Sequence, residues 1–436
     1  MTVLPSPPKN ILDEINKCIF NFIWDNKPDK IKRKILINDY KDGGLKVPNI
    51  YMLNKSIKAS WVKRLLDERN NHQYKAFYNS ALNKFGGKLV FESNIDEELI
   101  NRIANSYNFL KDILISWSEL SKYVQSGTSN ISKVVLWNNT DIKVNRETLF
   151  FDNWYRKGIK FVQHIFDYRT KDFYSFNDIK QLYDINDNDY LKYFQLIKSI
   201  PKKIKLSLIG ESPINADFIT LVQKIENSKQ KPNKILYNLQ IRQMKENHGL
   251  ESKWNNILDL ESIQWKKIFE LPLTSTIDTT LRAFQYKYIH RLIPTNKYLY
   301  KCQLVNSNLC QFCSENVETI EHLFWECRIV QNLWNQLHNL LLSVNLNVQL
   351  NLNTISFGIF KKSNISSLAS FLIIVMKFFI YGMKNRNITP TFKGYMSYLS
   401  LRYKIEYEIA FINEKLLVHE QKWQILQDKL QFRNTL

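Results

Sequence analysis

The sequence predicts a mainly α-helical protein, an assembly of many helices with one small β-hairpin region. Glycine and proline are scarce, with 11 of each among 436 residues, so little chain is left for the turns of an all-β protein. Apolar residues recur at helical spacing over most of the length. Hydrophobic residues make up 44% of the chain, which suits a sizeable core and excludes a disordered composition.

The first predicted helices lie in the N-terminal part of the chain. The opening helix ends before Pro28 and has apolar positions at helical spacing: Ile11, Ile15, Ile19, Phe22 and Ile23. A Gly-Gly turn in KDGGLKVPN separates it from a helical stretch in IYMLNKSIKASWVKRLLDE, and two more helices fit DEELINRIANSYNFLKDILISW. We expect an exposed apolar face near the N-terminus, formed by Ile15, Ile19, Phe22 and Ile23.

The helical spacing of apolar residues is interrupted around residues 133–152. KVVLWNN and RETLFF are short β-branched and aromatic runs, and they predict a small hairpin. Helical spacing returns in NWYRKGIKFVQHIFD, SFNDIKQLYDI and DYLKYFQLIKSIP. GESP (210–213) and NSKQKPN (227–233) are the best linker candidates. Further helices are predicted near residues 233–247, 276–292, 319–343, 365–385 and 392–428.

These elements divide the chain into four predicted parts. They are residues 1–70, residues 71–212 with the hairpin near 133–152, residues 213–360, and a C-terminal helical segment, residues 361–436.

The charge balance and the cysteine usage limit the class of protein. Lysine and arginine outnumber aspartate and glutamate by 61 to 41, a net charge of +20, which indicates a polyanionic partner. Five cysteines are too few for a disulfide framework, and residues 1–20 lack the pattern of a signal peptide. The most apolar run, residues 368–383, is interrupted by Lys377 and predicts a buried helix. We therefore expect an intracellular protein, in the cytoplasm or nucleus, without a membrane or small-molecule partner.

Residues 310–327, CQFCSENVETIEHLFWEC, carry the strongest chemical signal in the sequence. Two residues separate Cys310 from Cys313, eight separate Cys313 from His322, and four separate His322 from Cys327. Three thiolates and one imidazole are a standard ligand set for tetrahedral zinc, so we predict one Cys3His zinc knuckle. The alternative is a buried cluster of free thiols beside a polar histidine. We expect Cys18 and Cys302 to be small core residues.

Two geometric points qualify this zinc site. Thr319 is a suitable N-cap for a helix that contains His322 and Cys327. These two ligands are about 140° apart round an ideal α-helix, so the helix must be distorted there. With four protein ligands the site has no open position, and the ion is therefore structural, contributing on the order of 10 kcal/mol to local folding.

At this point a family resemblance can be stated. The knuckle, with RLIPTNKYLYK before it and ETIEHLFWECRIVQNLWNQL within and after it, resembles the reverse-transcriptase zinc-binding region of LINE-type non-LTR retrotransposon polyproteins. The stretch from INKCIFNFIWDNK to SWVKRLL is similar to the thumb segment of these polyproteins, and LWNNTDIKVNRETLFFDNWYRKGIKFVQHIFD is similar to their connecting region. The resemblance implies the C-terminal part of such a polyprotein, from thumb to end.

The resemblance also bears on activity. The sequence contains no pair of adjacent aspartates, and the Phe/Tyr-Ala-Asp-Asp sequence of the family's polymerase palm is missing, as is its endonuclease. We therefore expect no enzyme activity. The resemblance implies a nucleic-acid-binding module that holds RNA or DNA during target-primed reverse transcription, with a full-length polyprotein as a further partner. The alternative is a zinc-stapled structural or protein-interaction scaffold.

Two cationic stretches are the main candidate nucleic-acid contacts, and WYRKGIK (154–160) is a weaker third. KPDKIKRK (27–34) supplies Lys30, Lys32, Arg33 and Lys34, and RAFQYKYIHRLIPTNKYLYK (282–301) supplies Arg282, Lys287, Arg291 and Lys297. The second stretch also contains five interleaved aromatic residues that could stack on unpaired bases: Phe284, Tyr286, Tyr288, Tyr298 and Tyr300. The alternative is an amphipathic helix with its aromatic residues in the core and its cations solvated.

Overall fold

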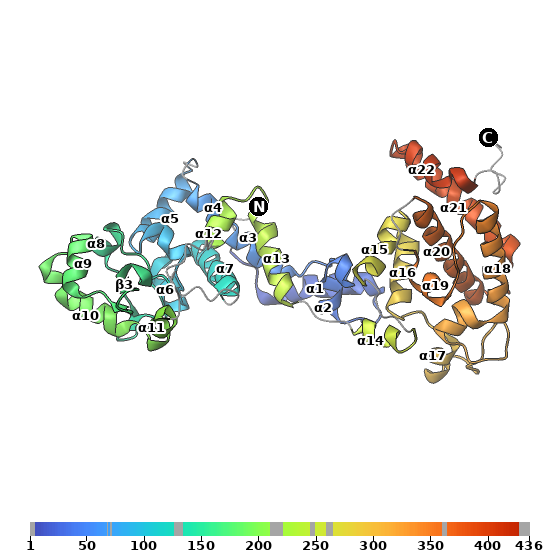
Figure 1. Ribbon diagram of the computed structural model, residues 1–436, viewed down its shortest axis with the longest axis horizontal. Coiled ribbons are helices and arrows are strands. Elements are labelled where there is room, and N and C mark those ends of the chain that lie inside the picture. The colour runs from blue at the N-terminus through green and yellow to red at the C-terminus, as the bar shows by residue number, and fades with distance from the viewer. Residues whose placement is uncertain are drawn as a thin grey trace. The chain divides into compact units, whose positions relative to one another are not determined.

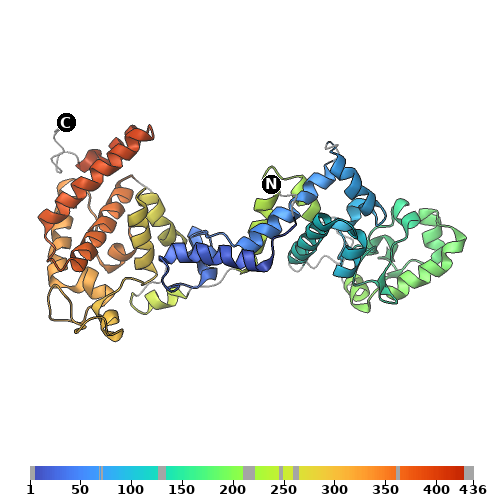
Figure 2. The same cartoon turned by 180° about the vertical axis from the view of Figure 1, so that it is seen from behind.

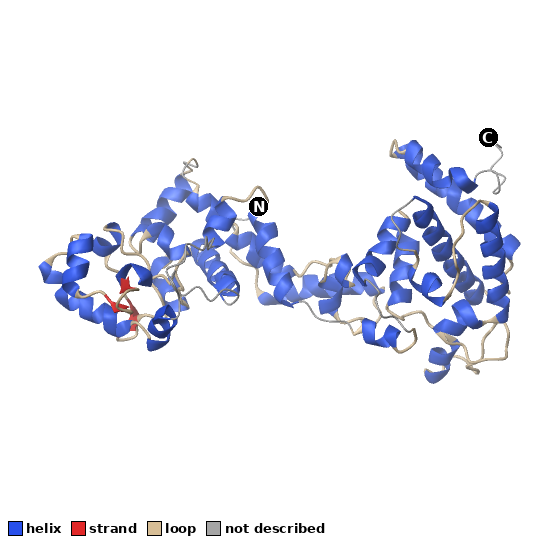
Figure 3. Ribbon diagram, viewed as in Figure 1, coloured by secondary structure: helices blue, strands red, loops and turns tan. Residues whose placement is uncertain are grey.

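The computed structural model describes residues 5–67, 69, 72–125, 134–209, 221–244, 249–258, 265–359 and 364–426. These residues are mainly helical, with two small two-stranded sheets, so the predicted fold class is confirmed (Figure 3). The chain forms two compact units, one of Met1–Asp29 and Pro48–Lys245 and the other of Lys30–Val47 and Glu246–Leu436. The predicted boundaries at residues 70, 212 and 360, and the linker GESP, lie outside the described residues.

The first unit contains α1 and the helices from α3 to α13 (Figure 1). Its α-helices are α1 (Lys9–Trp24), α3 (Ile50–Ala59), α4 (Trp61–Leu66), α5 (Gln73–Asn83), α6 (Glu97–Ile103), α7 (Asn108–Gln125), α8 (Asp152–Arg156), α9 (Phe176–Tyr183), α10 (Tyr190–Ser199), α11 (Lys202–Ile209), α12 (Leu221–Glu226) and α13 (Pro232–Met244). Short 3-10 turns are η2 (Gly87–Phe91), η4 (Val162–Ile165) and η5 (Asp187–Asp189). One core surrounds Trp61 and Trp117, and a second surrounds Trp137 and Trp154.

Helix α1 has the exposed apolar side that its sequence predicts. It buries Leu12, Phe20 and Trp24 but exposes Ile15 and Phe22. The helix ends at Trp24, before Pro28, as expected.

The two small sheets differ from the predicted hairpin. Strand β1 (Lys143–Val144) pairs with β2 (Glu147–Thr148) through a turn at Asn145 and Arg146, both with positive φ. Strand β3 (Phe166–Asp167) pairs with β4 (Asp172–Phe173), a hairpin that the sequence analysis missed. The hairpin thus lies within residues 133–152, but the strand predicted from KVVLWNN is wrong. There the described residues instead give the core Leu136 and Trp137 and one bridge from Val135 to Phe161.

The helix predicted from NWYRKGIKFVQHIFD is also wrong beyond its first turns. Helix α8 ends at Arg156, and Gly158 follows with a φ of 97°, a left-handed conformation that stops the helix. The chain then continues through η4 into β3.

Ten α-helices of the described residues belong to the second unit. They are α2 (Arg33–Ile37), α14 (Leu250–Asn255), α15 (Trp265–Ser275), α16 (Thr279–Ile289), α17 (Asn296–Lys301), α18 (Arg328–Ser343), α19 (Leu352–Phe357), α20 (Asn364–Asn385), α21 (Phe392–Ile412) and α22 (Leu416–Trp423), with turns η1 (Tyr40–Asp42), η6 (His322–Glu326) and η7 (Gln424–Leu426). Helices α15, α16, α18 and α20 supply most of one large core. The single helix predicted over 392–428 breaks at Asn413–Lys415, where Glu414 has a φ of 55°.

Helix α20 lies in the core of this unit. By length and composition Ser367–Asn385 could cross a membrane, but 72% of its most apolar window is buried inside the protein, as in a core helix. Lys377 is fully buried within it, and its Nζ donates to the Ser356 carbonyl at 3.3 Å and lies 4.0 Å from the ring centre of Tyr288. Burial lowers the pKa of Lys377 well below its ordinary value.

The segment Lys30–Val47 packs against α15 and α16. The Gly43 carbonyl accepts a hydrogen bond from the Tyr286 hydroxyl at 3.2 Å and lies 3.1 Å from Nε2 of His290. A Cβ on Gly44 would lie 2.0 Å from the Asn38 carbonyl oxygen, so only glycine fits there. The Gly-Gly turn is therefore what lets this segment join the second unit.

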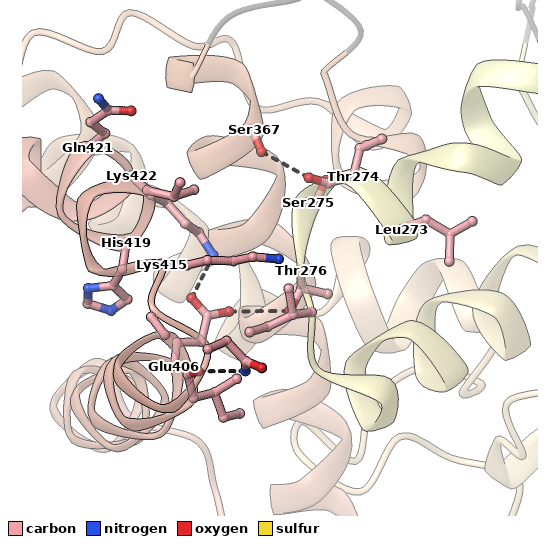
Figure 4. A pocket seen from close by; sticks show the side chains of 15 residues that line it. Leu273, Thr274, Ser275, Thr276, Ser367, Glu406, Lys415, His419, Gln421 and Lys422 are labelled. Atoms are coloured by element: carbon pink, nitrogen blue, oxygen red, sulfur yellow. Dashed lines mark hydrogen bonds and ion pairs between the residues drawn. The ribbon is translucent and has the colours of Figure 1, made fainter.

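A buried carboxylate holds α21, α22 and the end of α15 together. Glu406 accepts hydrogen bonds from Lys422 at 2.7 Å and Thr276 at 3.4 Å (Figure 4). It also accepts a hydrogen bond from Trp423 at 3.2 Å. A pocket of about 440 Å³ opens beside these groups, between residues 273–277 and the two helices. His419 also lies here, packed on Tyr403 and Trp423, and neither ring nitrogen has a hydrogen-bond partner among the described residues.

Lowering the pH through the titration range of His419 is expected to destabilise this packing. Burial lowers the pKa of His419 below its ordinary 6.5, and the nearby charge of Lys422 lowers it further. Glu406, the Tyr403 backbone and Glu420 raise this pKa, but their effect is smaller. The unfolded chain therefore takes up the proton at a higher pH than the folded chain does. Stability is complete above about pH 6.5 and falls as the pH drops below that value. Urea unfolding, followed by tryptophan fluorescence between pH 7.5 and 5, measures this.

The variant His419→Phe should lose less stability over this pH range than the wild type. The exposed His72→Phe is the matched control and should follow the wild type. Zinc release at acid pH affects all three proteins alike. Equal losses in His419→Phe and the wild type would contradict the assignment.

Candidate metal centre

The first two ligands lie in a tight turn. Leu309 and Val317 form an antiparallel bridge, and the Cys310 amide donates to the Asn316 carbonyl at 2.7 Å. The Ser314 amide donates to the Cys310 carbonyl at 2.8 Å, and Ser314 has a φ of 57°. This turn places the thiols of Cys310 and Cys313 side by side, both buried.

The other two ligands are joined by a π-helical turn. Thr319 accepts a hydrogen bond from the His322 amide at 3.0 Å, so its predicted capping role is confirmed. The Cys327 amide then donates to the His322 carbonyl at 2.9 Å, a five-residue step. This step brings the two ligands onto one face, which is the distortion that their spacing requires. Trp334 supports the turn by donating from Nε1 to the Phe324 carbonyl at 2.7 Å.

The four donor atoms fit a tetrahedral zinc ion. The sulfurs and imidazole nitrogen of Cys310, Cys313, His322 and Cys327 all lie within 4.8 Å of one another. The two thiols of Cys310 and Cys327 are 3.9 Å apart, and Nε2 of His322 is 3.4 Å from the sulfur of Cys313. In a zinc tetrahedron the donor atoms lie about 3.5–3.8 Å apart. The set holds one metal ion and leaves no protein position open.

The surrounding groups favour thiolates. Hydrogen bonding from the Cys310 thiol lowers the pKa of Cys327 to about 5 against the opposing effect of burial, helped by the amides of Val330 and Ile329 at the start of α18. The pKa of Cys310 is raised, because its thiol donates its proton in the hydrogen bond to Cys327. The backbone amides of Cys313 and Phe312 lower the pKa of Cys310. A zinc ion would replace that proton, and the amides would stabilise both sulfurs.

A buried ion pair fixes the knuckle to the core. Glu318 accepts from Lys384 of α20 at 2.9 Å and from the amides of Asn296 at 2.8 Å and Gln311 at 3.3 Å. Lys384 also donates to Asn296 Oδ1 at 3.2 Å and to the Pro294 carbonyl at 3.4 Å. Sequence reasoning missed this pair. The available signal was a lysine directly after a long apolar run, which must either reach solvent or find a partner.

Arg282 and Arg291, two of the eight predicted nucleic-acid residues, contact other groups of the second unit. The guanidinium of Arg282 donates to the carbonyls of Thr276 at 2.7 Å and Leu273 at 3.1 Å, where it caps the end of α15. Arg291 pairs with Glu321 and stacks on Trp254 at 4.8 Å. Burial alone would raise the pKa of Glu321, but Arg291 lowers it.

The other six predicted cations are exposed. They are Lys30, Lys32, Arg33, Lys34, Lys287 and Lys297, and all belong to the second unit. Their contact with nucleic acid stays a prediction.

The five interleaved aromatic residues divide in the same way. Phe284 and Tyr288 are core residues. The Tyr286 hydroxyl donates a hydrogen bond to the Gly43 carbonyl, in the segment Lys30–Val47. Tyr298 and Tyr300, on α17, are 58% and 50% exposed. The two remaining cysteines, Cys18 and Cys302, are exposed, so their predicted place in the core is wrong.

Comparison with known proteins agrees with this geometry. Residues 236–334 match the family model for zinc-binding in reverse transcriptase, a span that includes all four ligands. No curated protein matches the chain. The match and the Cys3His group together support a reverse-transcriptase-related protein with a site for one zinc ion.

Proposed function

We propose that this chain is the C-terminal, non-catalytic part of a LINE-type non-LTR retrotransposon polyprotein, with thumb, connecting and zinc-binding regions. In this role it holds RNA or DNA during target-primed reverse transcription. The family match at residues 236–334, the net charge of +20 and the missing palm aspartates support the proposal. Its partners are then a nucleic-acid backbone and a full-length polyprotein, and its place is the cytoplasm or nucleus.

The outer face of α17 is the observation that carries the proposal. Lys297 and Lys301 are exposed and lie about 40° apart round the helix. The exposed Tyr298 and Tyr300 lie on either side of this lysine pair, while Leu299 points the other way and is half-buried. Cations in the middle of a face can follow phosphates, and tyrosines at its two edges can stack on unpaired bases.

The zinc knuckle holds α17 in place. The Lys297 amide donates to the Glu318 carbonyl at 3.3 Å, and the Asn296 side chain donates to the Leu309 carbonyl at 2.8 Å. The structural zinc ion thus has a role in binding without taking part in chemistry. It fixes the knuckle loop that contacts α17, and α17 carries the exposed lysines and tyrosines.

The α17 face is expected to bind single strands through both charge and stacking. Titrating the zinc-loaded protein with a single-stranded RNA at several salt concentrations should give a log–log slope that falls by about 0.7 per lysine removed in Lys297→Gln/Lys301→Gln. Tyr298→Ala and Tyr300→Ala should each weaken binding by about 1–3 kcal/mol, whereas the phenylalanine variants should retain it. The same protein should give no product in a primer-extension assay with Mg²⁺.

Lys202→Gln/Lys203→Gln, on exposed positions of α11, removes the same charge elsewhere and is the matched control. Equal salt slopes for the α17 variants and the wild type would rule out this face. No binding by the wild type at low salt would favour the alternative, a zinc-stapled scaffold.

A further inference from the structure

Helix α21 has two apolar faces whose centres lie about 120° apart round the helix, and the second unit covers only one of them. It buries Tyr395, Leu399 and Ala410. On the other face, an exposed stripe, here called the α21 stripe, consists of Leu401 at 53% exposure, Ile405 at 39%, Ile409 at 37% and Ile412 at 76%. A helix that is apolar all round is normally buried all round. Figure 2 shows α21 as the long orange-red helix at the surface of its unit.

The spacing of the α21 stripe is that of a helix-pairing seam. Its members follow at intervals of four, four and three residues, so they lie within about 80° of one another round the helix. A stripe of this width matches the contact line of two packed helices. The exposed Tyr407 and Phe411 lie outside it, on another side of α21.

The stripe is symmetric about its own centre, near residues 406–407. An antiparallel partner helix of the same sequence, crossing at that point, would place Leu401 against Ile412 of the second copy and Ile405 against Ile409 of the second copy. A twofold axis repeats each of these contacts, as an isologous interface requires.

The charges beside the stripe have the same symmetry. Lys404 and Glu408 are exposed on one edge of it and are centred on residue 406. In the antiparallel arrangement Lys404 faces Glu408 of the second copy, and the symmetric contact repeats this pair. Edge charges of this kind set the partner and orientation of paired helices.

A pocket beside the stripe would receive the partner's side chains. It has a volume of about 390 Å³, and its apolar lining includes Ile405, Ile409, Leu281 and Phe371. Ile277, at 51% exposure, forms part of the same wall. Side chains from a facing helix could enter this pocket and bury more apolar surface than a helix–helix contact alone would.

We propose that α21 pairs antiparallel with α21 of a second copy of this chain. The pairing buries the α21 stripe and forms two ion pairs between Lys404 and Glu408. It does not depend on nucleic-acid binding or on the proposed function.

Sedimentation of the zinc-loaded wild-type chain between about 1 and 100 µM tests the proposal, and a monomer–dimer equilibrium is expected. Ile405→Glu places a charge in the seam and should abolish the dimer over this range. Lys404→Glu and Glu408→Lys each bring like charges together and should weaken the dimer about tenfold. The double variant Lys404→Glu/Glu408→Lys restores opposite charges and should dimerise like the wild type.

The charge exchange keeps the experiment falsifiable if a single variant folds poorly. Each single variant also breaks the i, i+4 pair within α21, which the double variant restores. A 1:1 mixture of the two single variants restores opposite charges only between copies, so it should dimerise better than either single variant alone. Glu315→Lys, an exposed charge change on the knuckle, is the matched control and should leave the dimer unchanged. A monomeric wild type would overturn the proposal. A dimer that survives Ile405→Glu would also overturn it.

Discussion

Replacing Cys327 by serine is expected to release the zinc ion and unfold the knuckle. Cys327 holds the metal and also begins α18, so its loss removes a ligand from a site whose metal binding is coupled to folding. A structural zinc ion of this type contributes on the order of 10 kcal/mol to folding, which is as large as the whole free energy of unfolding of a typical domain. Zinc content of the purified protein should fall from one ion per chain toward none, and limited proteolysis should cut within residues 302–327.

Cys302→Ser is the matched control, because Cys302 is close in sequence but exposed and outside the ligand set. It should keep one zinc ion and the proteolytic pattern of the wild type. If Cys327→Ser retained a full equivalent of tightly bound zinc, the assigned ligand set would be incorrect.

Replacing Glu318 by glutamine is expected to cost about 3–5 kcal/mol, because it leaves the buried charge of Lys384 without an anionic partner. Glu318 is fully buried, and the two amides that it accepts from would keep only one carboxamide oxygen. Urea unfolding of the zinc-loaded protein measures the loss as a lower midpoint.

The double variant Glu318→Gln/Lys384→Met should recover much of this loss, since it removes the unpaired charge. Glu315→Gln breaks the exposed pair with Arg328 and provides the surface reference, with a change of about 1 kcal/mol or less. A loss for Glu318→Gln no larger than that for Glu315→Gln would show that the buried pair does not support the knuckle.

The zinc site could be predicted from the sequence because its signal is local. Ligand type and spacing fix the four residues, and the awkward step from His322 to Cys327 even indicated that the helix must deform. The form of the deformation, a π turn supported by Trp334, depends on a helix packed across it, which spacing alone does not reveal.

The cationic and aromatic stretch was less predictable because its alternatives differ only in burial. Arg282 and Tyr288 belong to the same cationic and aromatic pattern as Lys297 and Tyr298. In the structure, however, Arg282 donates to a backbone carbonyl and Tyr288 is a core residue. Helical spacing cannot separate the two sets, because the chain turns at His290 and α17 begins a new direction. The missed hairpin of β3 and β4 is similar, since strands of two residues have no period to detect.

The position of Lys30–Val47 in the second unit has a consequence during synthesis. This short stretch leaves the ribosome early, but the helices that receive it follow only after about 200 further residues. At about 5–20 residues per second, the wait is roughly 10–40 seconds. A shortened gene beginning near residue 246 would encode the zinc ligands but not the segment that packs against α15 and α16, so expressing a piece that keeps Lys30–Val47 is the safer route to folded material.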